Sequence, residues 1–106
     1  MPKFLLQASY TTEGAKGLLK EGGSKRRAEV QKLVEGLGGK VEAFYYAFGA
    51  SDVFVIVDLP DHASAAAMSL AVNASGAVAL KTTVLFKPEE MDEAAKKGVA
   101  YRAPGK

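Results

Sequence analysis

The chain has 106 residues, of which 48% are hydrophobic and 25% are charged, and its formal net charge is +2. This length suits one hydrophobic core, so we expect residues 1–106 to form a single domain. The small net charge does not favour binding to nucleic acid or to a membrane surface. The chain contains no cysteine, which excludes disulfides and thiolate metal sites. No segment resembles a secretory leader or a membrane span, so we expect a cytoplasmic protein.

The first half of the chain predicts one strand and two helices. Alternating apolar residues favour a strand over 3–10, and Thr11 or Thr12 is a suitable cap for a short helix over 13–20. Gly22 and Gly23 are expected to separate this short helix from the next one. Ser24 is the expected N-cap of a longer helix, whose apolar positions are Val30, Leu33, Val34 and Leu37.

The second half predicts three strands and two helices. Strands over 40–48 and 53–59 are joined by only four residues, so they must form an antiparallel hairpin. Asp61 is the expected cap of the next helix, and a fourth strand is predicted over 77–86. The expected packing stripe of that helix consists of small residues and one leucine: Ala63, Ala66, Ala67, Leu70, Ala71 and Ala74. Residues 89–106 are predicted to form a short C-terminal helix and a tail.

This order predicts an α+β domain with the ferredoxin-like βαββαβ arrangement, in which one four-stranded antiparallel sheet carries both crossover helices on the same face. The other face would be apolar and uncovered, which favours a homodimer or a larger homo-oligomer packed sheet to sheet. Simple alternation along the two hairpin strands assigns this interface to five side chains: Phe44, Tyr46, Phe48, Phe54 and Ile56.

The segment from Tyr10 to Arg27 is rich in glycine and cations. Lys25, Arg26 and Arg27 would lie in the first turn of a helix, where the helix dipole disfavours positive charge. A bound anion would offset this cost, and backbone N–H groups after paired glycines can hold one. The predicted anion-binding residues are Lys16, Gly23, Ser24, Lys25 and Arg26. The alternative is an exposed loop whose cations are solvated or paired with nearby glutamates.

Three sequence blocks carry a resemblance to the GYD-domain family: Tyr10-Thr-Thr-Glu-Gly-Ala-Lys-Gly17, Gly22-Gly-Ser-Lys-Arg-Arg27 and Gly49-Ala-Ser-Asp52. The resemblance extends through nearly the whole chain, although Ser51 stands where the family's tyrosine is expected. It implies the fold of the dimeric α/β-barrel proteins. It implies no particular activity. Enzymes and ligand-binding regulators of the wider barrel class offer analogy only.

No catalytic signature is visible in the sequence. Weak catalytic candidates are His62, the only histidine, together with Tyr10 and Asp52, although Asp52 is also suited to bonding backbone amides. No metal site and no cofactor are expected. The favoured function is binding of a small organic or anionic ligand by a homo-oligomer. The alternatives are a cofactor-free enzyme of the barrel class, such as a monooxygenase or isomerase, and a structural assembly module.

Overall fold

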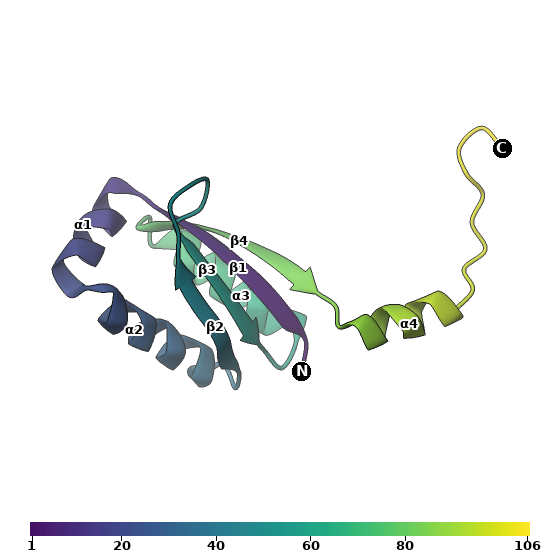
Figure 1. The fold of residues 1–106 in the computed structure, drawn as a ribbon, viewed down its shortest axis with the longest axis horizontal. Coiled ribbons are helices and arrows are strands. Elements are labelled where there is room, and N and C mark those ends of the chain that lie inside the picture. The colour runs from purple at the N-terminus through teal and green to yellow at the C-terminus, as the bar shows by residue number, and fades with distance from the viewer.

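The computed structural model describes all residues, 1–106. Four strands and four helices follow one another along the chain (Figure 1). In order they are β1 (Lys3–Tyr10), α1 (Thr12–Glu21), α2 (Gly23–Gly36), β2 (Lys40–Tyr46), β3 (Val53–Asp58), α3 (His62–Ala74), β4 (Val78–Leu85) and α4 (Pro88–Lys96). None of these helices combines the length and the hydropathy that crossing a bilayer requires.

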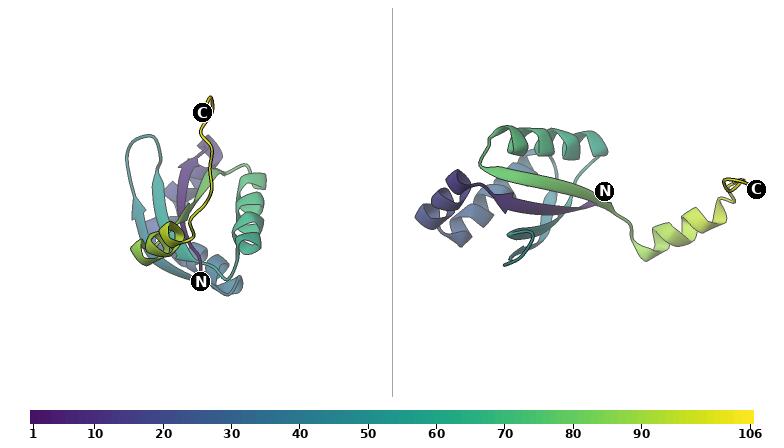
Figure 2. Two further views of the ribbon diagram at one scale, coloured as in Figure 1. Left: turned by 90° about the vertical axis from the view of Figure 1, so that its right-hand side faces the viewer. Right: turned by 90° about the horizontal axis from the view of Figure 1, so that it is seen from above.

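The sheet has the strand order β2-β3-β1-β4, and every neighbouring pair is antiparallel. This order confirms the ferredoxin-like arrangement predicted from the sequence. Helix α2 packs against β2 and α3 against β4, and both lie on one face of the sheet (Figure 2). Asn73 of α3 also bonds the backbone of Leu80, accepting from its N–H at 2.7 Å and donating to its carbonyl at 3.2 Å.

The hydrophobic core lies between this face and the helices. Alternate residues of β1 and β3 supply most of it, because successive side chains of a strand point to opposite faces. The buried apolar residues are Phe4, Leu6, Ala8, Val34, Val53, Val55, Val57, Leu59, Ala65 and Met68. The first helix, α1, lies beyond the end of β1 and contacts the sheet at that end.

A β-bulge in β2 changes which of its side chains face the helices. Val41 pairs with Val57, but Ala43 pairs with Ile56, so Glu42 is an extra residue in this strand. After the bulge, Phe44 lies opposite Val55 and Tyr46 opposite Val53, and both partners are core residues. The prediction that these two aromatic residues lie on the uncovered face is therefore wrong, because simple alternation does not survive the inserted residue.

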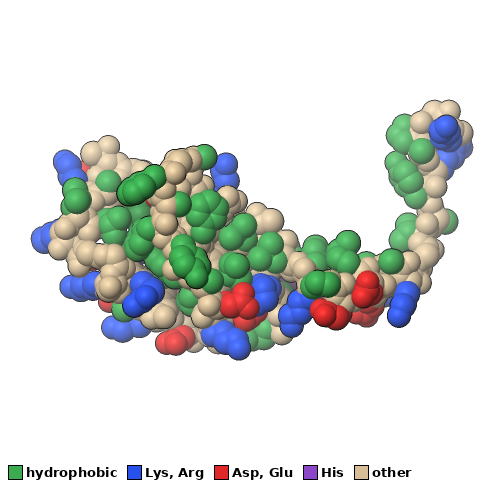
Figure 3. All heavy atoms as spheres, viewed as in Figure 1, with side chains coloured by type: hydrophobic (Ala, Val, Ile, Leu, Met, Phe, Trp, Pro, Cys, Tyr) green, Lys and Arg blue, Asp and Glu red, His purple; other side chains and the backbone are tan.

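The uncovered face keeps two of the predicted interface residues and gains others. Ile56 pairs with Leu5, and Phe54 pairs with Gln7 on one side and with Tyr45 on the other. Tyr45 is 71% exposed, and Figure 3 shows hydrophobic side chains gathered over this side of the sheet. Phe48 follows the end of β2, in the β2–β3 loop, and is fully exposed. We call the surface formed by Leu5, Tyr45, Phe54 and Ile56 the open face.

Lys3, Glu42 and Asp58 form an ion cluster at one end of the open face. The Lys3 Nζ atom lies 2.9 Å from a carboxylate oxygen of Asp58 and 2.9 Å from one of Glu42. A hydrogen bond from Lys3 holds the pKa of the Asp58 carboxyl below its usual value despite burial. The bulged residue Glu42 is thus tied to the central strand β1.

Two local predictions for the helices are wrong. Gly22, not Ser24, is the N-cap of α2, and no side chain caps that helix. Helix α3 buries Ala65 and Met68, whereas the predicted stripe, which includes Leu70 at 73% exposure, faces solvent. Nearly every residue of α3 is apolar or small, so periodicity alone could not identify its packed face. The predicted cap Asp61 is confirmed, because its side chain accepts from the Ser64 N–H at 2.7 Å.

Helix α1 forms in spite of two internal glycines. Thr11 caps it by accepting from the Gly14 N–H at 3.3 Å. Gly14 is buried against the backbone of Ala77, and a Cβ atom added there would lie 2.0 Å from the Ala77 carbonyl oxygen. At Gly17 a Cβ atom would meet nothing within 4 Å. Gly14 therefore permits close approach, whereas Gly17 only weakens the helix.

We predict opposite effects of alanine at these two positions. Gly14→Ala should destabilise the protein by about 1–3 kcal/mol, because the backbone of Ala77 must move away. Gly17→Ala is the matched control and should stabilise by about 0.5–1 kcal/mol through helix propensity. Urea unfolding followed by circular dichroism measures both. Equal effects of the two substitutions would contradict the close contact at Gly14.

Candidate functional site

Tyr10, at the end of β1, and Arg26, in the second turn of α2, lie at a small apolar cavity between the helices and the sheet. The cavity has a volume of about 70 Å³. Apart from Arg26, its lining consists of hydrophobic residues: Leu6, Ala8, Tyr10, Val30, Leu33, Met68, Val72, Val78 and Leu80. Sheet, α2 and α3 all contribute, so the cavity exists only in the assembled fold.

A larger and more polar hollow shares three of these residues. Its volume is about 330 Å³, and Tyr10, Arg26 and Val78 line it together with one side of α1. Glu13 and Glu21 of α1 lie in its wall. The guanidinium of Arg26 forms no ion pair, since the three pairs in the structure involve Lys3 and Lys32 only. Tyr10 and Arg26 thus stand where an apolar cavity meets a polar hollow.

Tyr46 brings the start of α2 close to the sheet. Its hydroxyl donates to the Gly23 carbonyl at 3.0 Å. A Cβ atom at Gly23 would lie 3.0 Å from the Tyr46 ring, so a larger residue there would require the ring to shift. A second open hollow of about 330 Å³ borders this contact and is lined by Gly23, Ser24, Arg27, Phe44 and Tyr46.

Burial and charge set the protonation of the two phenols. Burial, with a smaller contribution from the neighbouring Tyr46, raises the pKa of Tyr10 to about 12, although Arg26 acts in the opposite direction. Burial also raises the pKa of Tyr46, and Arg26 and Arg27 oppose that rise. At neutral pH both phenols are protonated, so each can donate a hydrogen bond to a ligand. A phenol with such a pKa is a poor general base.

Asp52 has a structural contact at this end of the sheet. Its Oδ2 atom accepts from the Tyr10 N–H at 2.8 Å, and its own N–H donates to the Ala8 carbonyl at 2.8 Å. The carboxylate therefore ties the β2–β3 loop to the end of β1. Asp52 thus bonds a backbone amide as expected, but the amide belongs to β1 and not to the hairpin that Asp52 was expected to fix.

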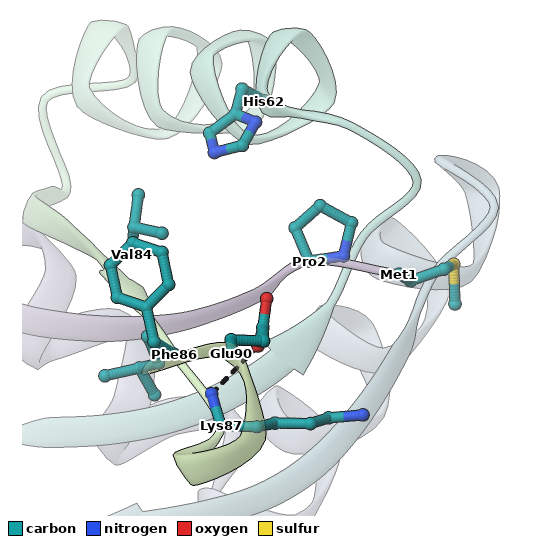
Figure 4. A pocket seen from close by; sticks show the side chains of 8 residues that line it. Met1, Pro2, His62, Val84, Phe86, Lys87 and Glu90 are labelled. Carbon is teal, nitrogen blue, oxygen red and sulfur yellow. Dashed lines mark hydrogen bonds between the residues drawn. The ribbon is translucent and has the colours of Figure 1, made fainter. Parts of the chain in front are cut away.

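His62 lies at the opposite end of the sheet from Tyr10. It packs edge-on against Phe4, with 5.5 Å between the ring centroids. It lines a different hollow, of about 400 Å³, with Met1, Pro2, Val84, Phe86 and Glu90 among its other residues (Figure 4). Phe4 and Tyr10 lie at opposite ends of β1, so the three catalytic candidates do not share one site.

The predicted anion-binding residues do not share one site either. Arg26 lines the cavity beside Tyr10, while Gly23 and Ser24 line the hollow on the other side of Tyr46, with Arg27 as the nearby cation. Lys16 and Lys25 are exposed and line none of these hollows. No cluster of three or more histidine, cysteine, aspartate or glutamate side chains could hold a metal ion.

Sequence reasoning did not place Tyr46 or the lining of the apolar cavity beside Tyr10. Helical spacing had marked Val30 and Leu33 as apolar, but Met68 and Val72 lie on a helix whose packed face was predicted wrongly. Tyr46 reaches the helices only because of the bulge at Glu42. No signal in a single sequence marks that insertion.

The raised pKa of Tyr10 predicts a pH-dependent loss of stability. Its folded-state pKa exceeds its unfolded value, so its contribution is complete below about pH 10 and is lost as pH rises toward 12. In Tyr10→Phe, the unfolding free energy should fall less steeply than in the wild type across this window. Denaturant unfolding at stepped pH, with the phenolate followed by ultraviolet absorbance, measures the difference. Identical slopes would contradict the assignment.

The comparison with family models agrees with the sequence blocks around this site. No curated protein shows significant similarity to the chain. The model of the GYD domain matches residues 4–95, which include Tyr10, both α2 arginines, Tyr46 and Asp52. Because this match spans most of the 106 residues, the chain belongs to the GYD domain family.

Proposed function

We propose that the protein is a homo-oligomer that binds a small molecule with a short apolar part and an anionic group. The observation that carries this proposal is the position of Arg26 and Tyr10 between the apolar cavity and the hollow beside α1. Ligand sites are mostly apolar concavities with a few polar groups that fix orientation, and this arrangement has that character.

The sizes of the two spaces suggest how a ligand would be divided between them. The apolar cavity of about 70 Å³ holds only a short hydrocarbon segment. The adjoining hollow, of about 330 Å³, has room for the remainder. Its far wall carries Glu13 and Glu21, so the anionic group belongs beside Arg26 and the Tyr10 hydroxyl rather than beside α1. An unpaired arginine and a protonated phenol are both hydrogen-bond donors for a carboxylate.

The open face supports self-association. It contains Leu5, Tyr45, Phe54 and Ile56 on adjacent strands, and no helix covers it. Monomeric proteins rarely expose a large contiguous apolar surface, and a twofold axis would bury this one against its copy. Sheet-to-sheet packing of this kind is also what the dimeric α/β-barrel arrangement requires.

The enzyme alternative has less support. Tyr10 is protonated at neutral pH, Asp52 accepts a hydrogen bond from the Tyr10 backbone N–H, and His62 lies in another hollow. A general base must lie within hydrogen-bonding reach of its substrate. The apolar cavity contains no carboxylate or imidazole, and the two carboxylates of the adjoining hollow, Glu13 and Glu21, lie in the wall formed by α1, away from Arg26 and Tyr10 in the proposed binding mode. The geometry therefore favours binding over acid–base catalysis at this site.

Binding of a short-chain carboxylate tests the proposed ligand class. Hexanoate should raise the melting temperature more than acetate or 1-hexanol at matched concentration and ionic strength, because it offers both an apolar chain and an anion. In Arg26→Gln the advantage of hexanoate should disappear. Arg27→Gln, which removes a neighbouring arginine outside the cavity, should retain it. Equal stabilisation by all three compounds in the wild type would contradict the proposal.

Self-association through the open face is tested separately. Phe54→Asp should shift the protein to smaller species or aggregates, since it places a charge in the centre of the apolar surface. Leu70→Asp adds the same charge on the outer face of α3, where Leu70 is 73% exposed, and should leave the assembly unchanged. Light scattering coupled to size exclusion measures both. An unchanged assembly of Phe54→Asp would rule out this interface.

A further inference from the structure

Residues 86–106 form an arm that leaves the body of the protein. Every residue from Phe86 to Arg102 is exposed, and α4 projects beyond the end of β4 (Figures 1 and 2). Large apolar side chains are among the exposed ones: Phe86 at 63%, Met91 at 56%, Val99 at 84% and Tyr101 at 78%. Nothing within one copy of the chain covers this surface.

Helix α4 has the pattern of a packed helix. Its apolar residues, Pro88, Met91, Ala94 and Ala95, share one side of the helix, and its carboxylates occupy the remainder. Pro88 at the helix start and the bond from the Lys87 N–H to Glu90 at 2.8 Å favour its first turn. Yet α4 has only 9 residues, and isolated helices shorter than about 12–15 residues are marginal in water. A packing partner is needed to stabilise it.

The charges of the chain indicate where that partner surface lies. Residues 16–27 carry five cations and one carboxylate, and helix α4 carries four carboxylates and one cation, Lys96 at its last position. None of these charges takes part in an ion pair within one chain. The two segments lie at opposite ends of a molecule that is 56 Å long (Figure 1). They can therefore meet only between different copies.

We propose that the arm of one copy packs on the α1–α2 end of a second copy, with acidic α4 against the cations of residues 16–27. A twofold axis would make the exchange reciprocal, so both arms and both basic ends would be covered in a closed dimer. Opposite potentials would steer the encounter, and the apolar side of α4 would supply burial. The contact would border the hollow that contains Arg26, so the partner's arm would help to enclose the ligand site. This inference rests on the self-association proposed above but not on ligand binding.

Cross-linking between isotopically distinct copies tests the exchange. Heavy-nitrogen and ordinary full-length chains are unfolded, mixed, refolded and treated with a zero-length carbodiimide that joins carboxylates to amines. Mass spectrometry should find heavy–light links between a carboxylate of α4 and Lys16, Lys20 or Lys25. Met91→Lys should abolish these links, because it places a charge on the apolar side of α4. Glu93→Lys, which puts the same residue on the opposite side, should retain links from the other carboxylates.

The outcomes separate this proposal from the proposed function. An oligomer by light scattering that gives no heavy–light links between α4 and residues 16–27 would overturn the arm exchange alone. A monomer would overturn both the exchange and the homo-oligomer. Links that survive equally in both variants would show that apolar packing of α4 is not involved, and would also overturn the proposal. Because α4 lies outside the core, neither variant should unfold the sheet, which circular dichroism checks.

Discussion

The bulge at Glu42 is the constraint on which the contact between the sheet and the start of α2 depends. A strand alternates its side chains between two faces, so one inserted residue exchanges the faces of everything that follows. Here it turns Phe44 and Tyr46 toward the helices and Tyr45 toward the open face. The Glu42 carboxylate also bonds Lys3 on the central strand at 2.9 Å, which stabilises the irregular backbone at this point.

This inversion brings Tyr46 against the start of α2, the helix that carries Arg26. Tyr46 can reach the Gly23 carbonyl only from the helix side of the sheet, and glycine lets α2 begin close to its ring. Tyr10 is held at the same end by the bond from its N–H to Asp52. Arg26 of α2 lines the same cavity as Tyr10. The site is thus built from one loop contact, one close helix approach and one strand irregularity.

Helices cover only one side of the sheet, which leaves an apolar face without a partner within the chain. Helices α2 and α3 bury the side of β1 that carries Phe4, Leu6 and Ala8, and nothing in the chain covers Leu5 or Phe54 on the other side. The arm of residues 86–106 is likewise unpacked within one chain. An open apolar face and an unsupported short helix both find their partners most simply in a second copy.

The sequence by itself determined the order of the strands and helices, the antiparallel hairpin and the ferredoxin-like arrangement, because these follow from local periodicity, short connections and glycine positions. It also identified Tyr10, Arg26 and Asp52 as candidates. Only the tertiary structure decided which aromatics face the helices, which side of α3 is packed, and which cations share a site with Tyr10. A bulge and a nearly uniform apolar helix leave no periodic signal, since their outcome depends on contacts between residues far apart in the chain.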